Sequence, residues 1–118
     1  MGTFRVRIEV GDPQGARFEA VDALVDTGAS HTSLPRPLLE RMAVKPHASG
    51  IFELAEGRQV EFAIGRTWVR IDGREEITLV VFGDEGSEPL LGAITLEEYQ
   101  LGIDPVRRRL MTVPGLMK

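Results

Sequence analysis

The sequence of 118 residues has no cysteine and only two histidines, His31 and His47. The lack of cysteine excludes a disulfide framework and a metal cluster held by thiolates. A metal bound by histidine and carboxylate is not excluded by this, but the two histidines show no paired ligand spacing. We therefore expect neither a metal site nor a cofactor.

Basic charge and long apolar runs are scarce as well. Lys and Arg number 14 against 18 Asp and Glu, a net charge of −4, which gives no electrostatic case for nucleic acid. No stretch approaches the ~20 apolar residues of a membrane span. Residues 1–10 alternate charged and apolar side chains and lack the apolar run of a signal peptide. We expect no nucleic-acid or membrane partner and a cytoplasmic location, unless an export signal has been trimmed away.

Strand-like segments dominate what is present. In residues 4–10 apolar side chains alternate with charged ones, which indicates a strand with one buried face. The turn-rich segment 11–15 then leads into a returning strand, Arg17–Val25. Further strand-like runs are Thr32–Leu34, Ile51–Leu54, Gln59–Ile64, Thr67–Ile71, Ile77–Phe82, Leu90–Gly92 and Arg109–Val113. Pro46–Gly50 is expected to be a loop, and Asp72-Gly73 a tight turn.

Two short helices complete the expected elements. Pro35 and Pro37 suit the first turn of one helix, which residues 38–42 continue with an apolar side. Thr95 and Glu98 have the spacing of a capping box, and Gly102 stands where that second helix would end. After it, residues 103–105 are expected to turn the chain. The sum predicts an all-β fold, a small closed β-barrel with one or two short helices, forming a single domain over residues 1–118.

The stretch Leu24–Ser30 holds the first candidate for chemistry. Two apolar residues end a buried strand, and Asp26 follows at its tip as a possible general acid or base. Gly28 permits a tight turn and the close approach of another backbone. An ordinary turn after a strand is the competing interpretation of Asp-Thr-Gly alone.

A second candidate is the hairpin centred on Gly57, between the two runs Ile51–Leu54 and Gln59–Ile64. Gly57 is expected at positive φ. Spacing alone favours a surface hairpin packed on the core, and a mobile flap over a site is the functional alternative.

Taken together, these motifs resemble the retropepsin-like aspartic proteases, the single-lobed relatives of pepsin. Leu24–Ser30 matches the apolar-apolar-Asp-Thr-Gly-Ala motif of that family. Leu90–Gly92 matches its apolar-apolar-Gly signature, which precedes a short helix, here Ala93–Gln100. The Gly57 hairpin lies between the two, where the family has its flap. Leu101–Pro105 is similar to the closing segment of bacterial and archaeal members.

The resemblance implies an aspartic endopeptidase acting on a peptide or unfolded-protein substrate. Asp26 would be catalytic, and the second carboxylate would come from Asp26 of a partner in a homodimer, because the chain has one Asp-Thr-Gly. Thr27 would brace the paired loops and Gly28 would approach the substrate backbone. Ala29 and Ser30 would line the floor of the cleft.

The remaining implied roles belong to the second motif and the hairpin. The structural motif packed beneath the cleft would be Leu90, Leu91 and Gly92, and the flap tip would be Glu56, Gly57 and Arg58. Ser30 departs from the second aspartate of viral enzymes, and the flap has a single glycine at its tip. A peptide-binding or dimerisation module without turnover is the alternative function, since a fold does not determine activity. His31 is expected to have a surface or loop role rather than to act as a base.

Overall fold

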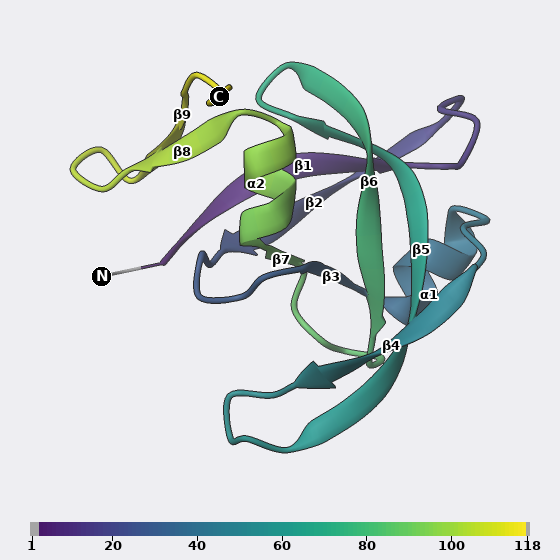
Figure 1. The fold of residues 1–118 in the computed structure, drawn as a ribbon. Coiled ribbons are helices and arrows are strands. Elements are labelled where there is room, and N and C mark those ends of the chain that lie inside the picture. Colours follow the sequence, from purple (N-terminus) through teal and green to yellow (C-terminus); the bar gives the residue numbers. More distant parts are fainter. Residues whose placement is uncertain (1–2, 118) are drawn as a thin grey trace.

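The computed structural model describes residues 3–117, and its fold is shown in Figure 1. Within that range lie nine strands and two helices: β1 (Phe4–Gly11), β2 (Phe18–Val25), β3 (Thr32–Pro35), α1 (Arg36–Arg41), β4 (Ala48–Glu53), β5 (Gln59–Ile71), β6 (Arg74–Gly83), β7 (Leu90–Leu91), α2 (Ala93–Glu98), β8 (Leu101–Asp104) and β9 (Arg109–Thr112). No helix in residues 3–117 is long and apolar enough to cross a membrane.

Seven of these strands form one sheet that closes on itself. The sheet has the order β1-β2-β7-β3-β6-β5-β4, and an additional pairing of β1 with β5 joins its two sides. Strand β5 has the length for this, because its first half pairs with β4 and its last residues pair with β1. The predicted small closed barrel with two short helices is therefore confirmed, and Figure 1 shows α2 beside the ring and the β4–β5 hairpin extending from it.

The hairpin region corrects two expectations about local structure. Gln59–Ile64 and Thr67–Ile71 were expected as separate strands, and the structure joins them in the continuous strand β5. The expected loop Pro46–Gly50 is also wrong in its last part, since Ala48 begins β4 and pairs with Ile64. Pairing between β4 and the long strand β5 extends both strands beyond the segments that their apolar patterns predicted.

One hydrophobic core fills the ring. Inward residues of the strands meet the apolar sides of both helices, namely Ile8, Val10, Val25, Leu34, Leu38, Leu39, Val69, Val80, Leu91, Leu96 and Tyr99. The hydroxyl of Tyr99 donates to the carbonyl oxygens of Val69, at 2.7 Å, and Glu76, at 2.9 Å. Burial raises the pKa of the Tyr99 phenol well above its usual value. The phenol thus fastens α2 to β5 and β6 as a neutral group.

The start of α2 differs from the predicted capping box. Gly92 is the N-cap, no side chain caps the helix, and Thr95 lies inside it. The Thr95 hydroxyl instead accepts a bond of 2.6 Å from Thr32 Oγ1. Glu98 accepts from Thr78 Oγ1 at 2.7 Å. Buried hydroxyls on β3 and β6 therefore engage the two side chains that the sequence pattern assigned to the cap.

The end of α2 also lies elsewhere. The helix ends at Glu98 with Tyr99 as its C-cap, whereas its end was expected at Gly102, and Gln100 follows with a positive φ of 53°. Gly102 lies within β8, where it pairs with Met111 of β9. The expected turn at residues 103–105 is therefore partly strand, because the β8–β9 hairpin continues to Asp104 before it reverses.

Candidate active site

Asp26 follows β2 at the edge of the closed sheet. Strand β7 runs parallel to β2 and pairs Val25 with Leu91. The Asp26 N–H donates to the Leu91 carbonyl oxygen at 3.1 Å, and the Gly28 N–H donates to Asp26 Oδ1 at 2.9 Å. Asp26, a partly buried residue, is therefore held through both its backbone N–H and its side chain, and one carboxylate oxygen accepts a bond from the turn.

The Leu90–Gly92 motif and the start of α2 pack against the Asp26 loop. A Cβ at Gly92 would lie 2.4 Å from the carbonyl carbon and oxygen of His31, so a larger residue would push the loop away. The Gly92 N–H donates to Thr32 Oγ1 at 3.1 Å. The next N–H groups, of Ala93 and residue 94, bond to the carbonyl oxygens of residues 29 and 30, each at 2.9 Å. The first turn of α2 and the Asp26 loop thus form one hydrogen-bonded unit.

Ser30 and His31 connect the loop to the hairpin. Ser30 Oγ lies 2.7 Å from His31 Nδ1. The His31 ring meets the ring of Phe52 on β4 edge to face, with 5.1 Å between centroids. His31 is therefore part of the cleft wall, although sequence analysis gave it only a surface or loop role.

The hairpin has the geometry expected around Gly57. Gly57 has a φ of +90°, which confirms the prediction of positive φ. The Leu54 N–H donates to the Arg58 carbonyl oxygen at 2.8 Å and closes the turn. Glu56 and Arg58 are exposed, with their charged groups 3.6 Å apart. The tip extends into solvent while the arms approach the Asp26 loop.

A cavity of about 440 Å³ lies between the loop and those arms. We call it the hairpin cavity. Its lining includes Gly28, Ala29 and Ser30 on one side and Phe52, Leu54 and Phe62 on the other. The structure therefore brings both predicted floor residues, Ala29 and Ser30, together with the hairpin arms, whereas the predicted tip residues 56–58 lie beyond the lining. Leu90 also contributes to the wall, while Leu91 and Gly92 are buried beneath it.

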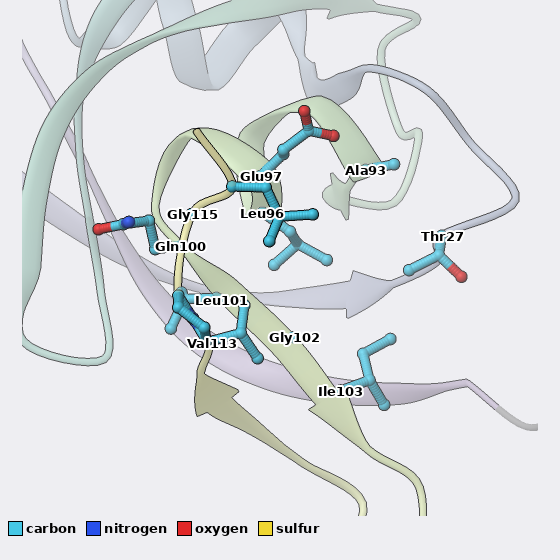
Figure 2. A pocket seen from close by; sticks show the side chains of 12 residues that line it. Thr27, Ala93, Leu96, Glu97, Gln100, Leu101, Gly102, Ile103, Val113 and Gly115 are labelled. Carbon is cyan, nitrogen blue, oxygen red and sulfur yellow. The ribbon is translucent and has the colours of Figure 1, made fainter. Parts of the chain in front are cut away.

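Thr27 opens onto a different hollow, shown in Figure 2. This helix groove has a volume of about 590 Å³, and its lining includes Leu96 and Glu97 of α2, Ile103 of β8 and Val113, which follows β9. The Asp26 loop therefore separates two hollows. Thr27 lines the helix groove, and Ala29 lines the hairpin cavity.

A family model described as gag-polyprotein putative aspartyl protease matches residues 17–98. That range contains the Asp26 loop, the hairpin and the Leu90–Gly92 motif. The chain belongs to this family. Membership supports a hydrolase that cleaves peptide bonds. No curated protein sequence matches the chain.

Solved structures of the same class share the fold. The chain is similar to the simian foamy virus (mac) protease at 18% identity and a TM-score of 0.57, covering 79% of this chain and 91% of the viral one. The retroviral protease-like domain of Ddi1 from Leishmania major is 23% identical with a TM-score of 0.56, and the match covers 92% of this chain and 87% of that domain. A retropepsin-like aspartic protease from Rickettsia conorii is 23% identical with a TM-score of 0.55, and the match covers 88% of this chain and 86% of that protein.

Two polar residues of the hairpin cavity gave no signal in the sequence. Ser33 and Ser87 both line it. Ser33 lies on β3, while Ser87 lies in the loop between β6 and β7. No periodicity or motif could link them, because the pairing of β3 with β6 and β7 is what brings them together.

Proposed function

We propose that the chain is an aspartic endopeptidase in which two Asp26 carboxylates, one from each chain of a homodimer, activate the attacking water. The observation that carries the proposal is the fixed Asp26 carboxylate, which accepts the Gly28 N–H at 2.9 Å beside the hairpin cavity. The substrate would be an extended, largely apolar peptide or unfolded-protein segment. Ala29 and the arms bearing Phe52 and Phe62 suit such a segment.

The chemistry requires two carboxylates that share one proton. The ionised carboxylate takes a proton from water, whose oxygen attacks the peptide carbonyl carbon, while the protonated one donates to the carbonyl oxygen. The C–N bond then breaks as the departing nitrogen takes up a proton. In aspartic proteases generally, two carboxyl groups about 3 Å apart cannot both ionise cheaply, and this keeps the shared proton in place.

A second chain is proposed as the source of the other carboxylate. Glu53 and Asp84 also line the hairpin cavity, but both are exposed. Among residues 3–117, neither carboxylate accepts a hydrogen bond like the one that holds Asp26. A twofold axis near the exposed Thr27 would supply an equally held partner.

The helix groove supports the same arrangement. Thr27 lines it together with apolar residues of α2 and β8. Exposed apolar side chains lie on α2, on β9 and on the residues that follow β9, namely Ile94, Met111 and Leu116. A second copy covering this surface would bury it and bring the two Asp26 loops together.

Two finer points belong to the proposal. We place the chain in the bacterial and archaeal branch of these proteases on the basis of Leu101–Pro105, which forms the β8 end of the closing hairpin. We also propose that it acts in the cytoplasm, without nucleic-acid or membrane partners.

Subunit mixing tests the shared site. Asp26→Asn should abolish cleavage of a diverse unfolded-peptide pool and leave the fold intact, because an amide keeps the shape but cannot cycle protons. Mixed with an equal amount of this variant, about half of the wild-type subunits pair with each other, so activity per wild-type chain should fall to about half. Co-purification of differently tagged chains first establishes that subunits exchange. Constant activity per wild-type chain despite exchange would mean that each chain holds a complete site.

The same assay separates the enzyme from a binding module. Cleavage by wild type and none by Asp26→Asn supports the endopeptidase. If both proteins bind the same peptides equally and neither cleaves them, the chain is a peptide-binding or dimerisation module on this barrel.

A further inference from the structure

Strands β5 and β6 separate at the base of the hairpin. Their pairing ends where Ile64 lies opposite Val81, and residues 59–63 of β5 pair only with β4. Strand β6 continues beside β3 as far as Gly83. Within residues 3–117, one edge of β5 therefore has no neighbouring strand over residues 59–63.

The hydrogen bonds at the hairpin tip determine which backbone groups point out from this open edge. The Leu54 N–H donates to the Arg58 carbonyl oxygen at 2.8 Å, so Arg58 faces β4. Successive residues of a strand direct their N–H and C=O groups to opposite sides, so residues 60 and 62 face β4 as well. Glu61 then directs both of its backbone groups to the open edge. An open edge of this kind is a template for pairing with another extended chain.

A groove of about 660 Å³ lies along the open edge. We call it the rear groove. Among residues 3–117, its lining consists of Arg36, Glu40, residues 43–46, residues 60–63, Phe82 and Asp84. The Asp26 loop is not part of this lining, so the rear groove is distinct from the hairpin cavity. Val44 and Phe82 are buried core residues, and they give the groove an apolar surface beside the strand edge.

The rim of the rear groove carries charges of both signs. The side chains of Arg36 and Glu40 lie 3.9 Å apart across one turn of α1. Lys45, Glu61 and Asp84 are the other charged residues of the lining. All five are exposed, so each attracts an opposite charge only weakly. The groove therefore suits an extended, largely apolar chain better than a charged ligand.

The rear groove adjoins the hairpin cavity, because Phe62 and Asp84 line both. A peptide held in the hairpin cavity extends in both directions when it is part of an unfolded protein. A chain that continues past Phe62 and Asp84 meets the open edge of β5. The occupant that this continuity favours is a further stretch of the same substrate chain.

We propose that the rear groove binds a second, extended stretch of the substrate, remote from the scissile bond, as a strand added to the open edge of β5. This inference rests on the proposed function. Backbone hydrogen bonds give such pairing affinity for many sequences, and apolar side chains add to it by burial against Val44 and Phe82. The enzyme therefore prefers long unfolded chains to short peptides.

Peptides of different length test the proposal. A short peptide covers only the cleavage site, and two long ones add an apolar, proline-free segment to its N-terminal or C-terminal end. With wild-type protein, one of the two extensions should raise kcat/KM about tenfold, mainly through KM, because Glu61 gains two backbone hydrogen bonds. A glycine–serine extension of equal length buries no apolar side chain and should raise it less. Equal values for the short and both long peptides, or an equal gain from glycine and serine, would overturn the proposal.

N-methylation of the favoured extension shows whether it binds as a strand. Successive N–H groups of an extended chain point to opposite sides, so only one of the two alternating sets faces β5. Methylation of that set should remove the gain in kcat/KM, and methylation of the other set should keep most of it. Equal effects of the two sets would refute strand addition.

Two proline variants on opposite edges of the hairpin assign the effect to β5. Ile51 lies opposite Glu61 in the β4–β5 register, so its N–H points to the other edge. Proline is tolerated where the N–H points out from an edge. Glu61→Pro should bring the long-to-short ratio of kcat/KM close to one, because it removes a donor and places a ring on the open edge. Ile51→Pro is the matched control and should keep the wild-type ratio. A ratio that survives in Glu61→Pro refutes the assignment.

A second variant is used if the melting temperature shows that Glu61→Pro is poorly folded. Glu40 is exposed and lines the groove from α1. Glu40→Trp narrows the groove without altering β5 and should also lower the long-to-short ratio. An unchanged ratio in a folded Glu40→Trp protein would contradict the proposal.

The outcome is separable from that of the proposed function. If wild type cleaves the short and long peptides equally well, the endopeptidase stands and the rear groove fails. If wild type cleaves no peptide, the endopeptidase proposal fails, and dissociation constants of the same peptides are measured instead. Tighter binding of a long peptide that is lost in Glu61→Pro would then uphold the rear groove, and equal binding would refute it.

Discussion

Asp12 shows how a single carboxylate stabilises a turn far from the active site. It follows β1, and its side chain is nearly covered, with 8% of the residue exposed. Asp12 Oδ1 accepts the N–H groups of Ala16 at 2.7 Å and Arg17 at 3.1 Å. The Arg17 N–H contributes most to lowering the pKa of Asp12 below its ordinary value, and the Ala16 N–H adds to it. The turn that returns the chain into β2, and so toward Asp26, is closed by these bonds.

This pKa shift predicts an acid-dependent loss of stability. The Asp12 pKa is lower in the folded than in the unfolded state, so its contribution is complete above the ordinary value of 3.8 and is lost as pH falls through the folded pKa. Asp12→Asn keeps an acceptor oxygen but cannot titrate. Its free energy of unfolding should change less with pH than that of wild type between about pH 2 and 5. Parallel curves from urea melts across this range would contradict the prediction.

At the scale of an element, the β4–β5 hairpin combines a free tip with an anchored base. Residues 59–63 of β5 pair with β4 alone, whereas residues 64–71 pair with β6. Motion of the tip therefore need not disturb the closed ring. That is the arrangement expected of a flap that closes over a substrate.

Two glycines with similar backbones test the flap. Gly57 and Gly73 have φ of +90° and +82°, and no atom lies within 4 Å of a Cβ built at either. Valine at each position should cost roughly 1–3 kcal/mol of stability through backbone strain. Only Gly57→Val should also lower kcat/KM, since Gly73 is in the turn between β5 and β6. Equal specific activity of the two folded variants would favour a surface hairpin without a closing role.

Sequence analysis succeeded where an interaction is local in the sequence and failed where it joins residues that are far apart in the sequence. The Asp72-Gly73 turn was predictable because its requirement is local, and the structure has positive φ at both residues. Thr95 was assigned wrongly to a cap, because its true partners, Thr32 and Thr78, are distant in sequence. The Asp26 loop was recognisable as a motif. The proximity of Ser33 to the end of β6 was not, since it exists only where β3 and β6 meet.

For the whole molecule, the unpartnered surface around the helix groove is the main feature. Ile94 is 40% exposed at the start of α2, and its N–H bonds to the Ser30 carbonyl oxygen. It therefore lies next to the Asp26 loop. Apolar side chains on this face are what a closed twofold interface would bury.

Charge at this face should separate the subunits. Ile94→Glu should raise the dimer dissociation constant about tenfold or more, because a carboxylate would be buried in the interface. Sedimentation at several concentrations measures this, and activity should be lost in parallel. Ile77→Glu is the control, since Ile77 is 48% exposed on β6, where it pairs with Trp68 of β5 and not with the Asp26 loop. An Ile94→Glu protein as dimeric and active as the control would exclude this face as the interface.

The two-residue strand β7 makes the Asp26 loop depend on residues that are synthesised late. Leu24 and Asp26 bond through their N–H groups to the carbonyl oxygens of Pro89 and Leu91, and Ala29 accepts from Ala93. A chain emerging from the ribosome therefore carries Asp26 long before the residues that hold it in place. Until residues 89–93 have been synthesised, the loop lacks these bonds. Under the proposed function, a protease acting on unfolded chains would complete its site only when most of its own chain has been made, which would limit damage to nascent polypeptides around it.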